Sequence, residues 1–357
     1  MCKLGIHISG FKCFKDSKFE LNKLTLLTGA NASGKSSVIQ ALLLLKVSSL
    51  LEEQKAIIDL SDMQYAFDFG NPDSLINNEL ENDKVAITIT EDASLIFYGA
   101  AQNQKRKLRI EIKQLGELKN IFKNGLIYFC AERQGPRFEY IRNLNEEGDC
   151  GCHGENTGNV MSDNWNTKIN GARLLDNAGE EALFNIALDE WVDYIFPGIT
   201  VRIQPSGSQS YQVIIRDHFH NFPTDSTNIG FGISYALPIL VGALLAKENS
   251  WLVVENPEAH IHAKAQSNMG YFLGTMASAG LRVLVETHSE HIVNGIRRSA
   301  IVGKRLQSKD VSIYFFREKS EHTLITFNES GDLSDFPIDF FDQSRQDMLE
   351  IINKIYQ

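Results

Sequence analysis

The sequence lacks any apolar run long enough to span a bilayer. Its longest apolar stretch, residues 41–45, covers a fraction of the roughly 20 residues that a membrane helix requires. No apolar leader follows Met1, and the five cysteines are an odd number, which does not suit a disulfide framework. We therefore expect a cytoplasmic protein with no membrane association.

An excess of basic residues is also missing. The 357 residues include 35 Lys and Arg against 45 Asp and Glu, a net charge of −10. Because binding to a phosphate backbone depends on clustered cations, this balance argues against a protein that binds nucleic acid over most of its surface. Two short basic runs leave local nucleic-acid contacts open: Lys105, Arg106, Lys107 and Arg109, and then Arg297, Arg298, Lys304 and Arg305.

A second pair of metal ligands is absent. Cys150, Cys152 and His153 form the one cluster with metal-binding chemistry, and zinc sites normally draw a further ligand pair from elsewhere in the chain. A glycine-rich loop with incidental cysteines is the better interpretation.

Periodicity divides the first half of the chain into strands, one long helix and loops. Strands are expected at 4–9, 18–21 and 24–28, and apolar residues at helical spacing predict a helix over 36–51. Alternation of apolar and polar residues over 83–113 predicts an antiparallel meander with one solvent-exposed face, and residues 126–130 are predicted to form a buried strand. Gly, Asn and Asp enrichment predicts an extended loop over 146–170, followed by a helix at 179–195 and strands within 201–216.

The last third alternates between helix and strand. Helices are expected at 233–246, after 259 and from 290, with strands at 251–254 and 282–286. Such alternation indicates βαβ units and a parallel sheet, hence an α/β fold. Internal repeats and sustained heptads are both absent.

A phosphate-binding motif joins the strand at 24–28 to the helix that follows. It consists of Gly29, Ala30, Asn31, Ala32, Ser33, Gly34, Lys35 and Ser36, and it fits the P-loop pattern. In such a loop backbone amides point at phosphate oxygens, the lysine reaches the outer phosphates and the hydroxyl ligates Mg²⁺.

Acidic and imidazole side chains follow two later apolar strands. The strand at 251–254 ends in Glu255-Asn256-Pro257-Glu258, and we expect it beside the P-loop strand, with its terminal carboxylate in the Mg²⁺ shell. The strand at 282–286 ends in Thr287-His288-Ser289. Ligands collect at the carboxyl ends of parallel strands, which favours a functional role for His288.

This succession of motifs resembles the ABC-class ATPase heads of the SMC, RecF and OLD (overcoming lysogenization defect) kind. It is most similar to small prokaryotic AAA-family ATPases with a C-terminal domain of unknown function. Residues 228–234 resemble their degenerate signature motif, and residues 339–343 resemble their C-terminal tag.

The resemblance implies a fold and an organisation. The fold is a P-loop ABC-ATPase head with a mixed central sheet, an antiparallel β lobe and a helical signature lobe. Residues 1–130 would hold the P-loop half, 131–230 a signature-side insertion, 231–320 the acidic strand and switch histidine, and 321–357 a tail.

The resemblance also implies roles for individual residues. The loop from Gly29 to Ser37 would hold ATP, Ser36 and Glu255 would hold Mg²⁺, and His288 would sense the γ-phosphate. Gly230, Gly232 and Ser234 would cap the nucleotide of a second subunit, so that ATP joins two heads into a homodimer.

Two departures affect the chemistry that the resemblance implies. Asn256 stands where the wider class has a glutamate, and an amide cannot act as general base on the attacking water. Glu258 is the nearest replacement, although it can equally be structural. Residues 232–235 also lack the usual Ser-Gly-Gly core. Hydrolysis is therefore expected to be slow.

Three functions compete. The first is an ATP-dependent switch that controls a separate effector, a nuclease or toxin, in anti-phage defence. Roughly 190 residues without heptad repeats separate the P-loop from the signature segment, which excludes the coiled-coil arms of an SMC protein. The roughly 70 residues after His288 contain no metal-binding cluster of acidic residues, which argues against a built-in nuclease of the OLD type. The alternatives are a DNA-repair ATPase of the RecF type and the ATP subunit of a transporter.

Overall fold

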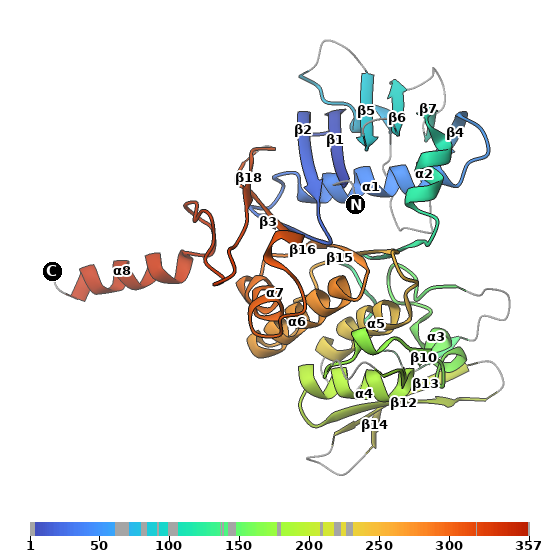
Figure 1. Cartoon of the computed structure of the whole chain (residues 1–357), viewed down its shortest axis with the longest axis vertical. Coiled ribbons are helices and arrows are strands. Elements are labelled where there is room, and N and C mark those ends of the chain that lie inside the picture. Colours follow the sequence, from blue (N-terminus) through green and yellow to red (C-terminus); the bar gives the residue numbers. More distant parts are fainter. Residues whose placement is uncertain are drawn as a thin grey trace.

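Two six-stranded sheets form the body of the molecule in the computed structural model (Figure 1). The structure describes residues 4–60, 71–79, 84–90, 93–98, 106–135, 137, 139–141, 148–176, 180–207, 210–217, 223–225, 231–318 and 320–355.

The first sheet is antiparallel and follows the order β2-β1-β5-β6-β7-β4. Its strands are β1 (Leu4–Phe11), β2 (Phe14–Leu21), β4 (Lys55–Asp59), β5 (Lys84–Ile89), β6 (Ser94–Tyr98) and β7 (Lys107–Lys113). Buried and exposed side chains alternate strictly along β7, as the sequence predicts for a sheet with one wet face. The meander expected over 83–113 is therefore confirmed by β5, β6 and β7, and β1, β2 and β4 extend it.

The second, central sheet follows the order β18-β17-β3-β16-β15-β8. Its strands are β3 (Leu24–Gly29), β8 (Leu126–Phe129), β15 (Trp251–Glu255), β16 (Arg282–Glu286), β17 (Val311–Phe316) and β18 (His322–Ile325). All neighbours are parallel except β17 and β18. Leu252 and Val254 enter the core on one face, whereas Trp251 and Val253 enter the core on the other. Burial on both faces explains why these strands read as continuous apolar runs.

Helices cover both faces of the central sheet (Figure 1). Helix α1 (Lys35–Ser49) lies between the two sheets, where nearly all its residues are buried, as expected of a helix that is apolar on all sides. The opposite face packs against α4 (Phe184–Ile195), α5 (Phe231–Leu245), α6 (Ala263–Ser278) and α7 (Glu290–Ile301).

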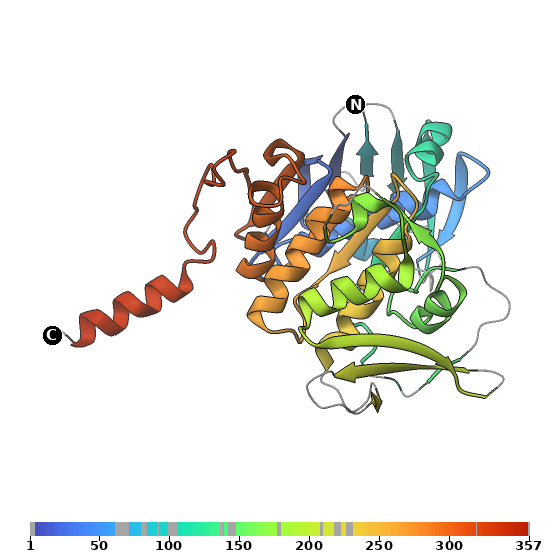
Figure 2. The same cartoon turned by 60° about the horizontal axis from the view of Figure 1, so that its bottom comes forward.

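Smaller elements complete the two ends of the molecule. Helix α2 (Leu115–Ile121) follows β7, and a third sheet of β9 (Tyr140–Ile141), β12 (Ile199–Pro205), β13 (Ser210–Asp217) and β14 (Pro223–Asp225) lies beyond α4 (Figure 2). Helix α3 (Thr157–Asp163) and the pair β10 (Lys168–Ile169) and β11 (Ala182–Leu183) lie nearby.

The last helix, α8 (Gln343–Ile355), stands away from this body in both views (Figures 1 and 2). None of its residues is buried. Met348, Ile351 and Ile355 are among its exposed apolar side chains.

Three sequence-based expectations are wrong. The loop expected over 146–170 contains α3, which the glycine-rich composition concealed; Gly158 is needed there because a Cβ would lie 2.7 Å from the Tyr140 ring. The helix expected from residue 179 begins at Phe184, since the preceding residues form β11. Strand β15 does not lie beside the P-loop strand, because β16 is inserted between them.

Candidate functional site at the ends of the parallel strands

The carboxyl ends of β3, β16, β15 and β17 meet at one edge of the central sheet. The loop between β3 and α1 begins at Gly29 and ends at Gly34, and both glycines have positive φ, 124° and 116°. A Cβ at Gly29 would lie 2.0 Å from the carbonyl oxygen of Phe316, and one at Gly34 would lie 2.8 Å from Sγ of Cys13. Only glycine fits at these two positions.

The lysine of this loop folds back onto the loop itself. Nζ of Lys35 donates to the carbonyl oxygens of Ala30 at 2.6 Å and Gly29 at 3.1 Å, and the side chain is 3% exposed. Burial lowers the pKa of Lys35, whereas the nearby Glu286 raises it. Together with the amino end of α1, this buried cation forms an anion site of the kind that binds phosphate.

The carboxylate nearest the P-loop hydroxyl belongs to Glu286. Oγ of Ser36 donates to Oε2 of Glu286 at 2.9 Å, and Nζ of Lys35 lies 4.0 Å from Oε1 of Glu286. Glu255 instead accepts hydrogen bonds from the Tyr128 hydroxyl at 2.9 Å and the Ala131 amide at 3.2 Å. The Ser36 hydroxyl therefore meets Glu286 and not Glu255, whose strand is not adjacent to β3, while a role for Glu255 in the Mg²⁺ shell stays a prediction.

Burial and a second carboxylate perturb this acidic group. The pKa of Glu286 is raised to about 7, first by burial and then by the charge of Glu255, while the Ser36 hydrogen bond and the Lys35 charge act in the opposite direction. Burial likewise raises the pKa of Glu255. Two carboxylates held close together in a buried site attract a cation.

Glu258 stabilises the turn after β16 through hydrogen bonds. Its carboxylate accepts from the Thr287 hydroxyl at 2.8 Å and from the His288 amide at 2.7 Å. Burial and the charge of Lys35 lower the pKa of His288, whereas Glu258 and a hydrogen bond to the Gly29 backbone raise it. The imidazole is thus held against the P-loop, and Glu258 positions the turn that carries it.

Asn256 follows the acidic strand in a left-handed conformation, with φ of 46°. Its amide donates to the carbonyl oxygen of Glu286 at 2.8 Å, and its own carbonyl accepts from Nη2 of Arg133 at 2.7 Å. Asparagine tolerates this conformation better than most residues. The backbone places Asn256 directly at the site, with an amide side chain that cannot accept a proton.

Family models for ATPases match most of this chain. An AAA ATPase domain matches residues 4–156, and a model described as "AAA domain, putative AbiEii toxin, Type IV TA system" matches residues 153–294. A family described as a protein of unknown function, DUF3696, matches residues 306–351. None of the curated proteins matches the chain.

Solved SMC heads share the architecture. The SMC head bound to the C-winged helix domain of ScpA has a TM-score of 0.53 at 11% identity, over 91% of this chain and 98% of that one. An SMC head with an extended coiled coil, bound to the C-terminal domain of ScpA and derived from Pyrococcus furiosus, has a TM-score of 0.52 at 10% identity over 99% of both chains. This chain has the fold of an ABC-type ATPase head. Within its described residues, no helix is both long and apolar enough to cross a membrane.

The residues of the head fit Mg²⁺ and a nucleotide. Among the described residues no cluster of three or more His, Cys, Asp or Glu side chains forms a complete metal site. Mg²⁺ needs only one or two protein oxygens when phosphates and water complete its shell, and Ser36 and Glu286 offer those.

The signature segment is described only in part. Gly230 lies outside the described residues, whereas Gly232 and Ser234 lie in the first turns of α5. A Cβ at Gly232 would lie 2.6 Å from the carbonyl oxygen of His260. Ser234 is 6% exposed in this conformation, and its expected contact with a second molecule stays a prediction.

Arg133 is a buried residue that the sequence analysis did not single out. At 3% exposure, its guanidinium donates to the carbonyl oxygens of Tyr235, Cys130, Glu255 and Asn256. It thereby joins the signature helix to the end of the acidic strand. No local motif marks such a residue, because its partners lie far away in the sequence.

Three of the four residues in the basic run near the C-terminus donate hydrogen bonds within the chain, and the fourth, Lys304, is exposed. Arg297 donates to the Gly331 carbonyl oxygen, and Arg298 donates to the Tyr194 hydroxyl and to Asn268. Arg305 donates to the carbonyl oxygens of Leu174 and Leu175. Of the other basic run, Lys105 lies outside the described residues. The three arginines stabilise the fold and are poorly placed to bind nucleic acid.

The cysteine cluster is packed into the interior. Cys130, Cys150 and Cys152 are buried free thiols, and Sγ of Cys130 lies 3.2 Å from Nδ1 of His153. Burial raises the pKa of the Cys130 thiol to about 11. Thiols that stay protonated bind metals weakly.

Proposed function

We propose that this head is an ATP-controlled switch that binds and slowly hydrolyses ATP, with Mg²⁺ as cofactor. The observation that carries the proposal is the convergence of the Lys35 cation, the Ser36–Glu286 hydrogen bond and the His288 turn at one end of β3. Bound Mg²⁺ would neutralise charge on the outer phosphates. Ser36 and Glu286 would hold it, with Glu255 at the end of the neighbouring strand β15.

Hydrolysis of ATP should be slow because none of the three polar residues after or at the end of β15 is free to accept a proton from the attacking water. Asn256 has no proton-accepting group, and the carboxylate of Glu258 is committed to Thr287 and His288. Glu255 is held by Tyr128 and Ala131. ATP would therefore persist on the head long enough to act as a signal.

The signal would be dimerisation. In the proposed homodimer the P-loop of one copy faces the signature segment around Gly230 and Gly232 of the other, so bound ATP contributes contacts to both. The SMC heads of similar fold were solved with a bound ScpA domain. By analogy of fold, the dimer would control a separate effector, a nuclease or toxin, in cytoplasmic anti-phage defence.

Light scattering tests the switch. The purified chain should be monomeric alone or with ADP and dimeric with ATP and Mg²⁺. Lys35→Ala should abolish the shift, whereas Lys113→Ala, which removes an exposed lysine of β7, should preserve it. A wild-type chain that binds no ATP, or that has one mass in every condition, would overturn the proposal.

Pull-down with the products of neighbouring reading frames tests the effector. A partner whose nuclease or toxic activity depends on ATP and on Lys35 supports control by the head. A partner with unchanged activity in the Lys35→Ala complex contradicts it.

A DNA-binding ATPase of the RecF type remains the alternative because of the exposed positions Lys107 and Arg109 on β7. Reversal of both to Glu should leave the head folded. Steep salt-dependent DNA binding that disappears in this variant would favour the alternative over the switch. Reversal of Arg297 and Arg298 is unsuitable, since their contacts support the fold.

A further inference from the structure

The C-terminal segment 339–343 lies at the P-loop. A cavity of about 750 Å³ opens there, and its wall consists of three segments together with His288, which marks the end of the cavity toward β16. Residues 28–33 line it from the P-loop, residues 315–318 from the end of β17, and Asp339, Phe341, Asp342 and Gln343 from the segment that precedes and begins α8. The proposed function assigns no role to this third wall.

The direction of a bound nucleotide follows from the order of the strands. Ser36, Glu286 and His288 lie toward β16, on one side of β3, and β17 lies on the other side. In the proposed function the outer phosphates and Mg²⁺ bind next to Ser36, Glu286 and His288. The nucleoside end therefore belongs on the β17 side, where Phe341 and Asp342 line the cavity.

The segment is built to hold a fixed position. Phe340 is 2% exposed and packs edge-on against Phe315, with ring centroids 5.3 Å apart. Its neighbours Asp339 and Phe341 have positive φ, 70° and 55°. A bulky side chain seldom adopts this conformation, and such strain concentrates at functional sites. The anchoring of Phe340 leaves Phe341 at the cavity wall.

The chemistry of this wall suits a nucleoside. Phe341 is a partly buried aromatic ring, and aromatic rings bind the π-faces of bases. Oδ1 of Asp342 is buried and lacks a hydrogen-bond partner within the described residues. Asp342 is also one of the residues that line the cavity, and a carboxylate accepts hydrogen bonds from donors such as a ribose hydroxyl or an exocyclic amine.

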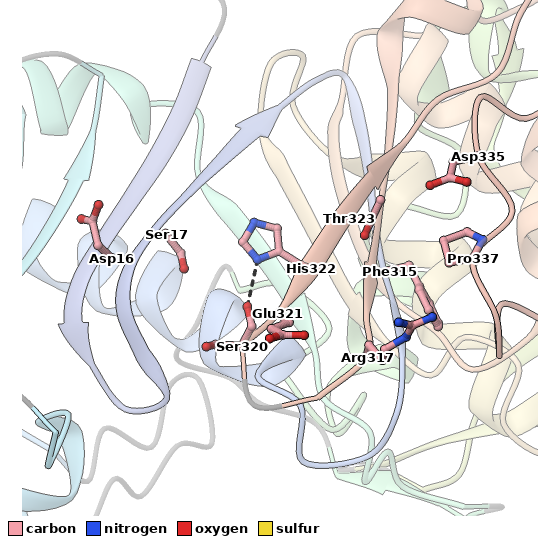
Figure 3. Close-up of a pocket in the computed structure, with 10 residues that line it drawn as sticks. All are labelled: Asp16, Ser17, Phe315, Arg317, Ser320, Glu321, His322, Thr323, Asp335 and Pro337. Atoms are coloured by element: carbon pink, nitrogen blue, oxygen red, sulfur yellow. Dashed lines mark hydrogen bonds between the residues drawn. The ribbon is translucent and has the colours of Figure 1, made fainter.

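Further space lies beyond the end of β17. A second cavity of about 710 Å³ shares Phe315 and Arg317 with the first and extends to Ser320, His322 and Asp16 (Figure 3). The dashed line in Figure 3 joins His322 to Ser320, where Nδ1 of the imidazole lies 3.0 Å from the carbonyl oxygen. Room for a nucleoside therefore continues past the phosphate loop on the β17 side.

We propose that Phe341 and Asp342 form the nucleoside subsite of the ATP pocket, so that occupancy of the pocket is transmitted to α8. The inference rests on the proposed function and extends it to the C-terminal segment. Helix α8 begins at Gln343, and the carbonyl oxygen of Asp342 accepts from the amides of Arg345 and Gln346 at 3.0 Å. A ligand that contacts residues 341–342 would therefore act directly on the hydrogen bonds of the first turn of the helix.

Paired affinity measurements test the subsite on the full chain. ATP and inorganic tripolyphosphate are titrated into wild type, Phe341→Ala, Asp342→Asn and Ile338→Ala. The last is a control from the same segment, 66% exposed and outside both cavities. Phe341→Ala should weaken ATP binding about tenfold, in line with one base-aromatic contact, and leave tripolyphosphate affinity unchanged. Equal changes for both ligands, or none for ATP, would overturn the subsite.

Hydrogen exchange supplies a readout independent of affinity. ATP should slow exchange at the amides of residues 341–346 in wild type, and tripolyphosphate should not. The same protection with both ligands would contradict transmission through the nucleoside. A wild type that binds neither ligand would refute the proposed function itself, whereas Lys35-dependent ATP binding without any effect of Phe341→Ala would refute only this inference.

Discussion

The Ser36 hydroxyl donates to Oε2 of Glu286 across 2.9 Å, linking the first turn of α1 to the end of β16. The carboxylate is 6% exposed, and Nζ of Lys35 lies 4.0 Å from its other oxygen. In the proposed function this hydroxyl and carboxylate would hold Mg²⁺ at the base of the phosphate loop. Phosphate oxygens and water would supply the remaining ligands.

Glu286→Gln should raise the Mg²⁺ concentration that ATP binding requires. The amide preserves shape but loses the charge that attracts the cation, so we expect at least a tenfold higher Mg²⁺ requirement, about the cost of disturbing a metal ligand. Titration of a fluorescent ATP analogue at increasing Mg²⁺ concentrations measures this requirement. Glu290→Gln, on an exposed residue of α7, should behave as wild type. An unchanged requirement in Glu286→Gln would remove this residue from the cation site.

The pH dependence of stability provides a second test of Glu286. Its pKa rises from 4.5 to about 7 in the folded chain, so between these values the folded state keeps a proton that the unfolded state has lost. Stability from this group is therefore full below about pH 4.5 and declines as pH rises through 7, by about 3 kcal/mol in total at ~1.4 kcal/mol per pH unit. Urea unfolding in EDTA from pH 5 to pH 8 should show this decline in wild type and Glu290→Gln. In Glu286→Gln the decline should be clearly smaller, because only other buried carboxylates such as Glu255 then contribute, and an unchanged slope would assign the titration elsewhere.

The P-loop could be predicted because it is a local motif whose geometry depends on adjacent residues. The strand order could not, because spacing along the chain does not reveal that β16 is inserted between β3 and β15. Because of that insertion, the Ser36 hydroxyl donates its hydrogen bond to Glu286 and not to Glu255. Arg133 escaped notice for a related reason, since its contacts are with backbone carbonyls, which carry no residue signature.

The C-terminal segment shows the same limit. Residues 339–343 could be recognised as a motif, but their position at the cavity depends on Phe340 packing against Phe315 across the fold. Helix α3 was missed because its glycine and asparagine are typical of loops, although burial against α5 and β13 holds them in a helix.

Glu258 should act by positioning His288. Glu258→Ala removes the acceptor of the Thr287 hydroxyl and the His288 amide, so turnover should fall about tenfold or more while ATP affinity stays near wild type. His288→Ala should have the same signature, and the double variant should be no slower than the slower single variant, as for residues that act as a unit. Single-turnover hydrolysis measures each rate.

Glu258→Gln separates positioning from proton transfer. Its amide oxygen can still accept from the His288 amide, so positioning predicts partial recovery of turnover relative to Glu258→Ala. General-base catalysis predicts equal loss in both variants, and that result would reverse the assignment.

Asn256→Glu should raise turnover at a cost in stability. A carboxylate at this position supplies the missing proton acceptor, for which about a hundredfold faster hydrolysis is a typical gain. The cost arises because φ is 46° there, a conformation that glutamate tolerates less well than asparagine, by roughly 1 kcal/mol. Asn249→Glu is the matched control, since Asn249 has φ of 59° in the turn before β15 and lies outside the site. Both variants should lose similar unfolding free energy in urea, but only Asn256→Glu should hydrolyse ATP faster. If its rate stays at the wild-type level, the absence of a glutamate at position 256 does not limit hydrolysis.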